Sequence, residues 1–223
     1  MSAWPETGRG SLDSADAPRR PRHPLEIPEA LALVARARAR SAILVEGWSD
    51  EAAIVALAGL EGTDLAGSGV VILPVGGVTN LARFAGALRA SGPGVRLSGL
   101  YDANEEPLAL RGLQLAGLGT ELTRAAAERA GFFVCDNDLE DELIRALGTV
   151  AVERLLAAQD ELSSFRRFQV QPAQLGRDRH GQLRRFMGTR AGRKIRYGAL
   201  LVSALEPARV PPSLRRVLSH ALA

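Results

Sequence analysis

Three groups of acidic residues in this sequence each follow a short apolar run. The first is Glu46 with Asp50, the second begins at Asp102, and the third extends from Asp136 to Glu142. A carboxylate at the end of a buried strand is costly unless a positive charge meets it. Hard divalent cations prefer oxygen ligands, and carboxylates supply them. The pattern therefore predicts that these groups meet at one metal-holding edge.

The chemistry of such an edge would be that of a magnesium-type site. Magnesium usually takes a few carboxylates and leaves its other positions to water and substrate phosphate. Glu46, Asp102 and the acids of 138–141 suffice for one ion, or for two about 4 Å apart, which could support phosphodiester cleavage. Structural roles are the alternative, because Asp50 and Asp138 are suitable helix caps and Glu140 could lie on a solvated helix face.

The elements that must position these acids alternate between strands and helices. Apolar runs predict strands at 41–46, 70–75, 95–101 and 132–135, and helical spacing or caps predict helices at 50–60, 81–90, 107–116, 121–130 and 138–147. The alternation predicts an α/β fold with a mostly parallel sheet of about four strands and helices on both faces. Right-handed crossovers place all the strand C-termini on one edge.

Two regions flank this α/β domain, which we place at 27–148 with a leading helix. Residues 1–26 are polar and rich in Pro and Arg, which predicts a disordered tail. Residues 149–223 are expected to form a helical, basic region packed on the domain. Its predicted helices are 150–162, 184–187, 192–205 and 213–222, with an irregular basic stretch before 184.

Composition is that of a soluble globular protein, with 46% hydrophobic and 24% charged residues among 223. No apolar run approaches the roughly 18 residues of a membrane span, and no secretory signal is apparent. The single Cys135 excludes an internal disulfide and a multi-cysteine metal site. A cytoplasmic location is the simplest interpretation.

Charge divides the chain into an acidic body and a basic end. Residues 1–163 hold 15 arginines against 23 acids, whereas 164–223 hold 12 arginines and one lysine against two acids. This division suits a protein that holds cations in one place and a polyanion such as DNA in another. A merely solvated basic face is the alternative.

At this point the motifs become specific. The segment 45–54, VEGWSDEAAI, resembles the glutamate motif of TOPRIM domains, and its Gly-Xaa-Ser-Asp form is most similar to OLD-family (overcoming lysogenization defect) nucleases. The segment 100–106, LYDANEE, occupies the place of the family's Asp-Xaa-Asp motif, and 134–147 resembles a later acidic segment. The resemblance implies a Rossmann-like TOPRIM fold and a metal-dependent nuclease.

The resemblance also implies roles for individual residues. Glu46 would be a metal ligand or general acid/base, and Asp102 a metal ligand. Asn104 departs from the family pattern because it stands where a second aspartate is usual, which leaves the second metal in doubt; Glu105 or Glu106 could substitute. The implied ligands of one or two Mg²⁺ or Mn²⁺ ions are Glu46, Asp50, Asp102, Glu105, Asp138 and Glu140.

Lys194 is the single lysine of the chain, and it resembles the catalytic lysine of OLD-type nucleases. An ammonium is a compact charge that can meet developing charge on phosphate. A chance occurrence is the alternative. The arginines around it are predicted to contact the nucleic-acid backbone; they are Arg184, Arg185, Arg190, Arg193 and Arg196.

The sequence thus predicts a metal-dependent DNA nuclease or nickase with Glu46 and Lys194 as catalytic residues. The ATPase that OLD nucleases carry has no counterpart here, because no Gly-Xaa4-Gly-Lys-Ser/Thr loop occurs, so a separate ATPase chain is a possible partner. One alternative is a catalytically degenerate TOPRIM module that binds nucleic acid or a partner. Another is a receiver- or phosphatase-like domain in which Asp102 accepts phosphoryl.

Overall fold

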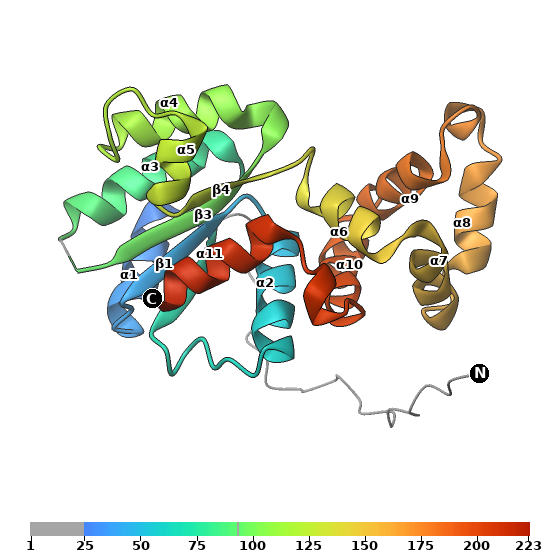
Figure 1. Ribbon diagram of the computed structural model, residues 1–223, viewed down its shortest axis with the longest axis horizontal. Helices are drawn as coiled ribbons and strands as arrows, with labels where there is room; N and C mark the ends of the chain where they lie inside the picture. The colour runs from blue at the N-terminus through green and yellow to red at the C-terminus, as the bar shows by residue number, and fades with distance from the viewer. Residues whose placement is uncertain (1–24, 93) are drawn as a thin grey trace.

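A four-stranded parallel sheet forms the centre of the structure, a computed structural model that describes residues 25–92 and 94–223 (Figure 1). The strand order is β2-β1-β3-β4. The strands are β1 (Ser41–Val45), β2 (Val70–Pro74), β3 (Arg96–Asp102) and β4 (Phe132–Cys135). The predicted α/β fold with a mostly parallel four-stranded sheet is confirmed.

The register of the strands brings their carboxyl ends to one edge. Val45 pairs with Pro74, and Asp102 pairs with Cys135. All five residues of β1 are buried, as expected for a strand with neighbours on both sides and helices on both faces. The segments that follow β1, β3 and β4 therefore leave the sheet side by side.

One face of the sheet is covered by helices that follow or precede the strands in sequence. They are α1 (Ile27–Arg36), α3 (Val78–Ala90), α4 (Glu106–Leu115) and α5 (Arg124–Arg129). Their apolar side chains share one core with alternate residues of the strands, among them Leu44 and Phe132. Helices α3, α4 and α5 of this layer are seen at the top of Figure 1.

The opposite face is covered by α2 (Trp48–Leu60) and by the last helix of the chain, α11 (Pro212–Leu222). Helix α10 (Ala191–Ser203) packs along α2, and both contribute to the second core together with Ile43 and Val45 of β1. Two helices of the basic C-terminal region therefore return to the α/β domain (Figure 1).

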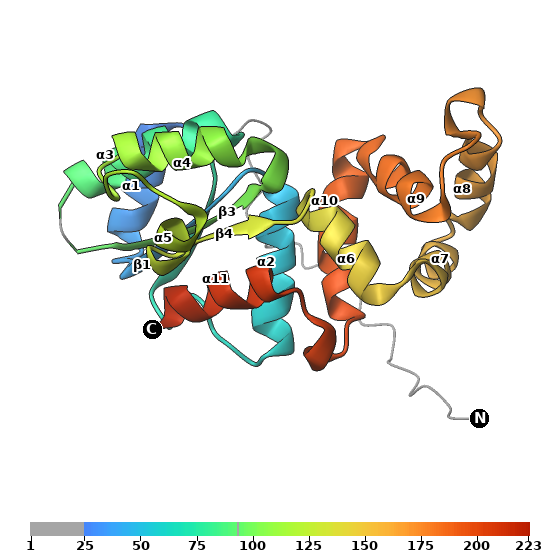
Figure 2. The same cartoon turned by 45° about the horizontal axis from the view of Figure 1, so that its top comes forward.

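The remaining helices form a lobe at the side of the sheet, which Figure 2 shows on the right. They are α6 (Leu139–Leu147), α7 (Thr149–Ala158), α8 (Leu162–Gln169) and α9 (Arg179–Gly188). The centre of this lobe is aromatic: the ring centroid of Phe186 lies 5.2 Å from that of Phe165 and 5.5 Å from that of Phe168. The lobe places α6 and α9 next to the carboxyl edge of the sheet.

Two regions differ from the sequence expectations. The stretch expected to be irregular before 184 contains α8 and the first half of α9, because Phe165 and Phe168, three residues apart, both pack on Phe186. Helix α5 begins at 124 rather than 121, because the hydroxyl of Thr123 caps it by accepting a hydrogen bond from the N–H of Ala126.

The expected disordered tail lies outside the described residues over 1–24. Its last two residues belong to the fold: the N–H of Leu25 donates to the carbonyl of Pro74, and Glu26 caps α1. Among residues 25–92 and 94–223, no helix has the length and apolar character needed to cross a membrane.

Candidate metal centre

Three carboxylates meet at the carboxyl edge of the two central strands. Glu46 directly follows β1, Asp102 ends β3, and Glu105 lies in the single 3-10 turn after β3. Each offers an oxygen, and these oxygens all lie within 4.8 Å of one another. Because β1 and β3 are hydrogen-bonded neighbours, the parallel topology itself creates this cluster. Oxygen ligands at this spacing suit a divalent cation.

The electrostatics of the cluster favour a cation. Burial raises the pKa of Glu46 to about 8, helped by a hydrogen bond with Glu105 and by the charge of Asp102. Burial and the charges of neighbouring acids raise the pKa of Asp102 to about 7. Oxygen Oε1 of Glu46 is buried without a hydrogen-bond partner among the described residues. A divalent ion would both satisfy that oxygen and offset the repulsion.

Asp50 closes the turn between β1 and α2. Its Oδ2 accepts a hydrogen bond from the N–H of Gly47 at 2.8 Å, which stabilises the first turn of α2. Burial, followed by the charge of Glu140, raises the pKa of Asp50 to about 7, whereas Lys194 lowers it. Asp50 therefore interacts electrostatically both with the three-carboxylate cluster and with Glu140 of α6.

Glu140 and Lys194 form an ion pair at the same edge. The Nζ of Lys194 lies 3.2 Å from Oε2 of Glu140, whose side chain is only 5% exposed. Burial opposes the charge of Lys194, but Glu140 and Asp50 outweigh it, and the pKa of Lys194 is raised. The lysine is thus held as an ammonium beside the acidic groups.

A close helix contact fixes the position of that lysine. A Cβ on Gly198 would lie 2.5 Å from the carbonyl oxygen of Ser49, so the backbones of α10 and α2 touch there. Lys194 lies one turn before Gly198 on α10, and Asp50 follows Ser49 on α2. The contact therefore controls the distance between Lys194 and the site.

Asp138 has two partners inside the protein. Its Oδ1 caps α6 by accepting the N–H of Asp141 at 2.8 Å, and its Oδ2 accepts the Nε of Arg184 at 2.7 Å. Asp138 is not part of the three-carboxylate cluster. After burial, its charge is nevertheless the largest contribution to the raised pKa of Asp102, so the two carboxylates are close enough to interact electrostatically.

The five arginines expected at nucleic acid fall into two groups. Arg193 is buried, donates to Oε2 of Glu161 at 2.9 Å and lies over the ring of Phe186; Arg196 pairs with the same glutamate at 2.6 Å. These two hold α10 to the helical lobe. Arg185 and Arg190 are exposed without an ion pair to any described residue, and Arg184 is partly exposed.

The structural roles of two acids in this region were missed from the sequence, where Asp141 appeared only among the acids of 138–141 that could hold metal. Asp141 accepts hydrogen bonds from Arg145 and lies 2.7 Å from Nε2 of His180, and Glu161 binds two arginines of α10. The i,i+4 spacing of Asp141 and Arg145 could have been recognised. The partners of Asp141 on α9 and of Glu161 on α10 lie 39 and 32 residues away, and nothing local indicates them.

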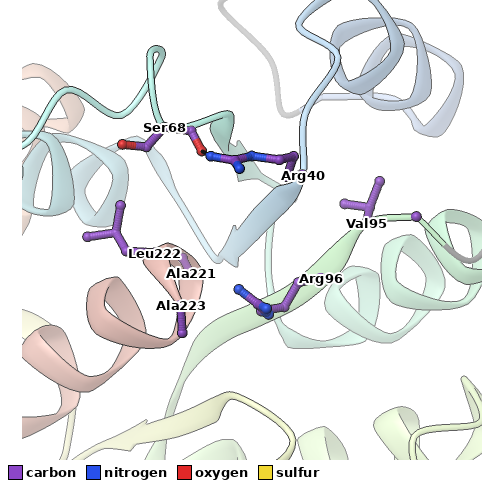
Figure 3. A pocket seen from close by; sticks show the side chains of 8 residues that line it. Arg40, Ser68, Val95, Arg96, Ala221, Leu222 and Ala223 are labelled. Carbon is purple, nitrogen blue, oxygen red and sulfur yellow. Dashed lines mark hydrogen bonds between the residues drawn. The ribbon is translucent and has the colours of Figure 1, made fainter.

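The amino edge of the sheet, opposite the carboxylate cluster, carries basic rather than acidic side chains. A hollow of about 450 Å³ lies there, lined by Arg40, Ser68, Arg96 and the last turn of α11 (Figure 3). No acidic side chain is among the described residues that line it. The negative end of the α11 dipole suits the two arginines, so we assign no ligand to this hollow.

The comparisons with known proteins agree with this geometry. Residues 39–102 match the family described as "Overcoming lysogenization defect protein-like, TOPRIM domain". The matched stretch contains Glu46 and Asp102. No curated protein matches the chain in sequence.

Solved structures resemble the chain over most of its length. One is the C-terminal region of the Xanthomonas campestris pv. campestris OLD protein, at 24% identity and a TM-score of 0.62, covering 82% of this chain and 95% of that one. Another is the C-terminal region of the Burkholderia pseudomallei OLD protein, at 21% identity and a TM-score of 0.63, covering 82% and 97%.

Proposed function

We propose that this chain, which carries a TOPRIM domain resembling that of OLD proteins, is a divalent-cation-dependent nuclease that cleaves or nicks DNA. One observation carries the proposal: Glu46, Asp102 and Glu105 meet within 4.8 Å, with the pKa of the first two strongly raised. Such a cluster is unfavourable by itself and favourable around a cation, which TOPRIM domains typically bind.

Magnesium or manganese bound there would polarise a phosphate oxygen and make water a better nucleophile. Glu46, Asp102 and Glu105 would hold the ion. Asn104 is exposed, and Glu105 takes its place in the cluster, which supports a complete first site despite the departure from the family motif. The candidate ligands of a second ion are Asp50, Glu140 and Asp138, which do not form a cluster as close as that of the first site.

A role as general acid/base is the alternative to a role as metal ligand for Glu46. Its pKa is about 8 in the cation-free protein, and a general acid/base works best when its pKa lies near the working pH. A cation bound directly to Glu46 would lower that pKa, so the proton-transfer role requires that Glu46 is not itself a ligand of the ion.

Lys194 is suited to stabilise charge that develops on phosphate. Its side chain is 45% exposed, and its ammonium is held in place by an ion pair with the buried Glu140. Charge held in place before the reaction lowers the barrier without reorganisation.

The nucleic acid would lie over the exposed arginines of α9 and of the turn before α10. Arg185 and Arg190 are free to contact phosphates, and Arg184 lies closest to the acidic site. Backbone contacts of this kind supply affinity and register without reading sequence.

A nicking assay tests the proposal. Supercoiled plasmid is incubated with the full chain and Mg²⁺ or Mn²⁺, beside the variants Glu46→Gln and Glu61→Gln. Glu61 is a matched control, because it ends α2 at the surface and only approaches Arg215 at 4.0 Å. We expect nicking by the wild type and by Glu61→Gln, and none by Glu46→Gln or with chelator. Equal nicking by Glu46→Gln contradicts the proposal.

A binding module without cleavage is the second candidate, and Asn104 in place of the usual aspartate favours it. The same assay separates the two, because the module would shift DNA in a gel in a salt-sensitive manner and leave the plasmid supercoiled. Its binding would not depend on Asp102→Asn. A partner such as a separate ATPase chain would fit this candidate as well as the first.

A further inference from the structure

Asp138 and Arg184 were expected to bind different partners, but they form an ion pair with each other in this structure. Asp138 is a candidate metal ligand, and Arg184 is a candidate phosphate contact. Instead, the Nε of Arg184 donates to Oδ2 of Asp138 at 2.7 Å, and its Nη2 donates to the same oxygen. While the pair is closed, Oδ2 of Asp138 and the Nε and Nη2 donors of Arg184 are engaged with each other.

The two oxygens of Asp138 have separate roles. Oδ1 accepts the N–H of Asp141 and caps α6, which holds the side chain in place. Only Oδ2 is taken by the arginine. A cation could therefore take Oδ2 without any loss of the helix cap.

Arg184 can change partners without a change of fold. Its side chain is 40% exposed, so a phosphate can reach the guanidinium from solvent. A phosphate suits the planar guanidinium, because it can accept two parallel hydrogen bonds.

A second contact keeps the two helices together when Arg184 moves. Asp141 on α6 lies 2.7 Å from Nε2 of His180, which lies one turn before Arg184 on α9. Asp141 is also held by Arg145 of its own helix. Helix α9 thus stays docked on α6, and the exchange involves side chains alone.

We propose that Arg184 is an exchange residue that couples DNA binding to cation binding. In the free protein it occupies Oδ2 of Asp138. When a DNA phosphate binds Arg184, Oδ2 turns to the divalent cation beside Asp102. The inference rests on the proposed function and adds its regulation: the acidic site reaches its full ligand set only when substrate is present.

The exchange has a thermodynamic consequence. If DNA strengthens cation binding, the cation must strengthen DNA binding by the same factor. Couplings between two sites are typically 5- to 150-fold, and we expect a factor on the order of 10 for one exchanged ion pair.

Binding of Mn²⁺, rather than cleavage, is the measurement. Free Mn²⁺ is followed by electron paramagnetic resonance during titration of the full chain, with and without a phosphorothioate duplex that resists cleavage. The Mn²⁺ bound by the duplex alone is subtracted. For the wild type, we expect the duplex to lower the Kd for Mn²⁺ on the order of 10-fold.

Arg184→Gln and Arg185→Gln form the matched pair of variants. Arg184→Gln is expected to bind Mn²⁺ more tightly than the wild type without DNA, because Oδ2 of Asp138 is already free, and to show no further effect of DNA. Arg185 is the exposed neighbour without an ion pair to a described residue, so Arg185→Gln weakens DNA binding but keeps the coupling factor. Asp138→Asn is expected to remove the coupling as well.

The outcomes separate this inference from the proposed function. If Arg184→Gln shows the wild-type coupling factor, or if the wild type binds Mn²⁺ with no effect of DNA, the exchange is wrong and the metal site stands. If the wild type binds no Mn²⁺, or if Glu46→Gln binds it equally well, the proposed function is wrong and the exchange with it.

Discussion

Two sets of carboxylates in the molecule differ in their partners. Glu46, Asp102 and Glu105 have one another for neighbours, and the pKa of Glu46 and of Asp102 is raised, first of all by burial. Asp141 and Glu153 are also removed from water, yet arginines bind both. Hydrogen bonds from these arginines outweigh burial, and the pKa of both acids is lowered.

The difference separates structural acids from candidate ligands. An acid that already holds a guanidinium is satisfied in the folded protein, and it stabilises contacts between helices. A group of acids without a cation destabilises the fold and persists where it has another use. By this criterion the strand-end cluster is the candidate functional set, and Asp138, which contributes to the raised pKa of Asp102 but holds Arg184, lies between the two sets.

The largest expected effect comes from exchanging one acid of each set for its amide. Asp102→Asn removes a ligand and is expected to lower DNA cleavage by about 100-fold or more, since even outer-shell changes at metal sites cost 10- to 100-fold. It should also stabilise the cation-free protein at pH 8. Glu153→Gln should keep cleavage and lower the free energy of unfolding by about 1 kcal/mol, because its arginines are half exposed.

Cleavage rates and urea unfolding of the two variants check this contrast. A loss of cleavage in Glu153→Gln comparable to that in Asp102→Asn would remove the distinction between the sets.

Glu161 tests a structural acid whose partner, Arg193, is buried. Glu161→Gln leaves the guanidinium of Arg193, whose side chain is 5% exposed, without its counter-charge. Unpaired buried charges cost about 3–5 kcal/mol, so urea unfolding should show a loss of about 3 kcal/mol. Arg196→Gln removes the exposed partner and should cost less than about 1 kcal/mol. Equal costs for the two variants would contradict a structural role of the buried pair.

The helix contact beside Lys194 gives a smaller effect on stability and a specific effect on function. Gly198→Ala places a methyl group against the backbone of Ser49, and overpacking typically costs about 1–3 kcal/mol. The shift of α10 moves Lys194, so kcat for cleavage should fall more than DNA affinity. Gly192→Ala on the same helix meets nothing within 4 Å and is the control. An unchanged kcat in a folded Gly198→Ala protein would show that the contact does not position the lysine.

The pH dependence of stability gives the smallest shift. Glu46 and Asp102 ionise at about pH 8 and 7 in the folded protein and near 4 when unfolded. Between these values the folded state binds more protons, so the stability of the cation-free protein falls as pH rises from about 5 to 8. We expect Tm to drop by a few degrees and Mg²⁺ to reduce the drop. A rise of Tm over this pH range would contradict the prediction.

Local patterns in the sequence were sufficient to predict the α/β domain and the acidic carboxyl edge of its sheet. Apolar runs marked all four strands, and their alternation with helices predicted parallel strands whose carboxyl ends meet. Glu46 and Asp102 follow directly from that topology, because each ends one of two neighbouring strands. The motif resemblance left Glu105 and Glu106 open, and their geometry differs: Glu105 joins the cluster, whereas Glu106 pairs with Arg124.

The sequence by itself determined the strands and helices of the α/β domain, their order and the acidic character of one edge, because these depend on residues close together in the chain. Only the tertiary structure decided which charges are free. The partners of Arg184 and Arg193 lie 46 and 32 residues away, and α8 is organised by packing on a later helix. The sequence does not show whether a charged side chain is neutralised, because the packing of distant helices brings its counter-charge to it.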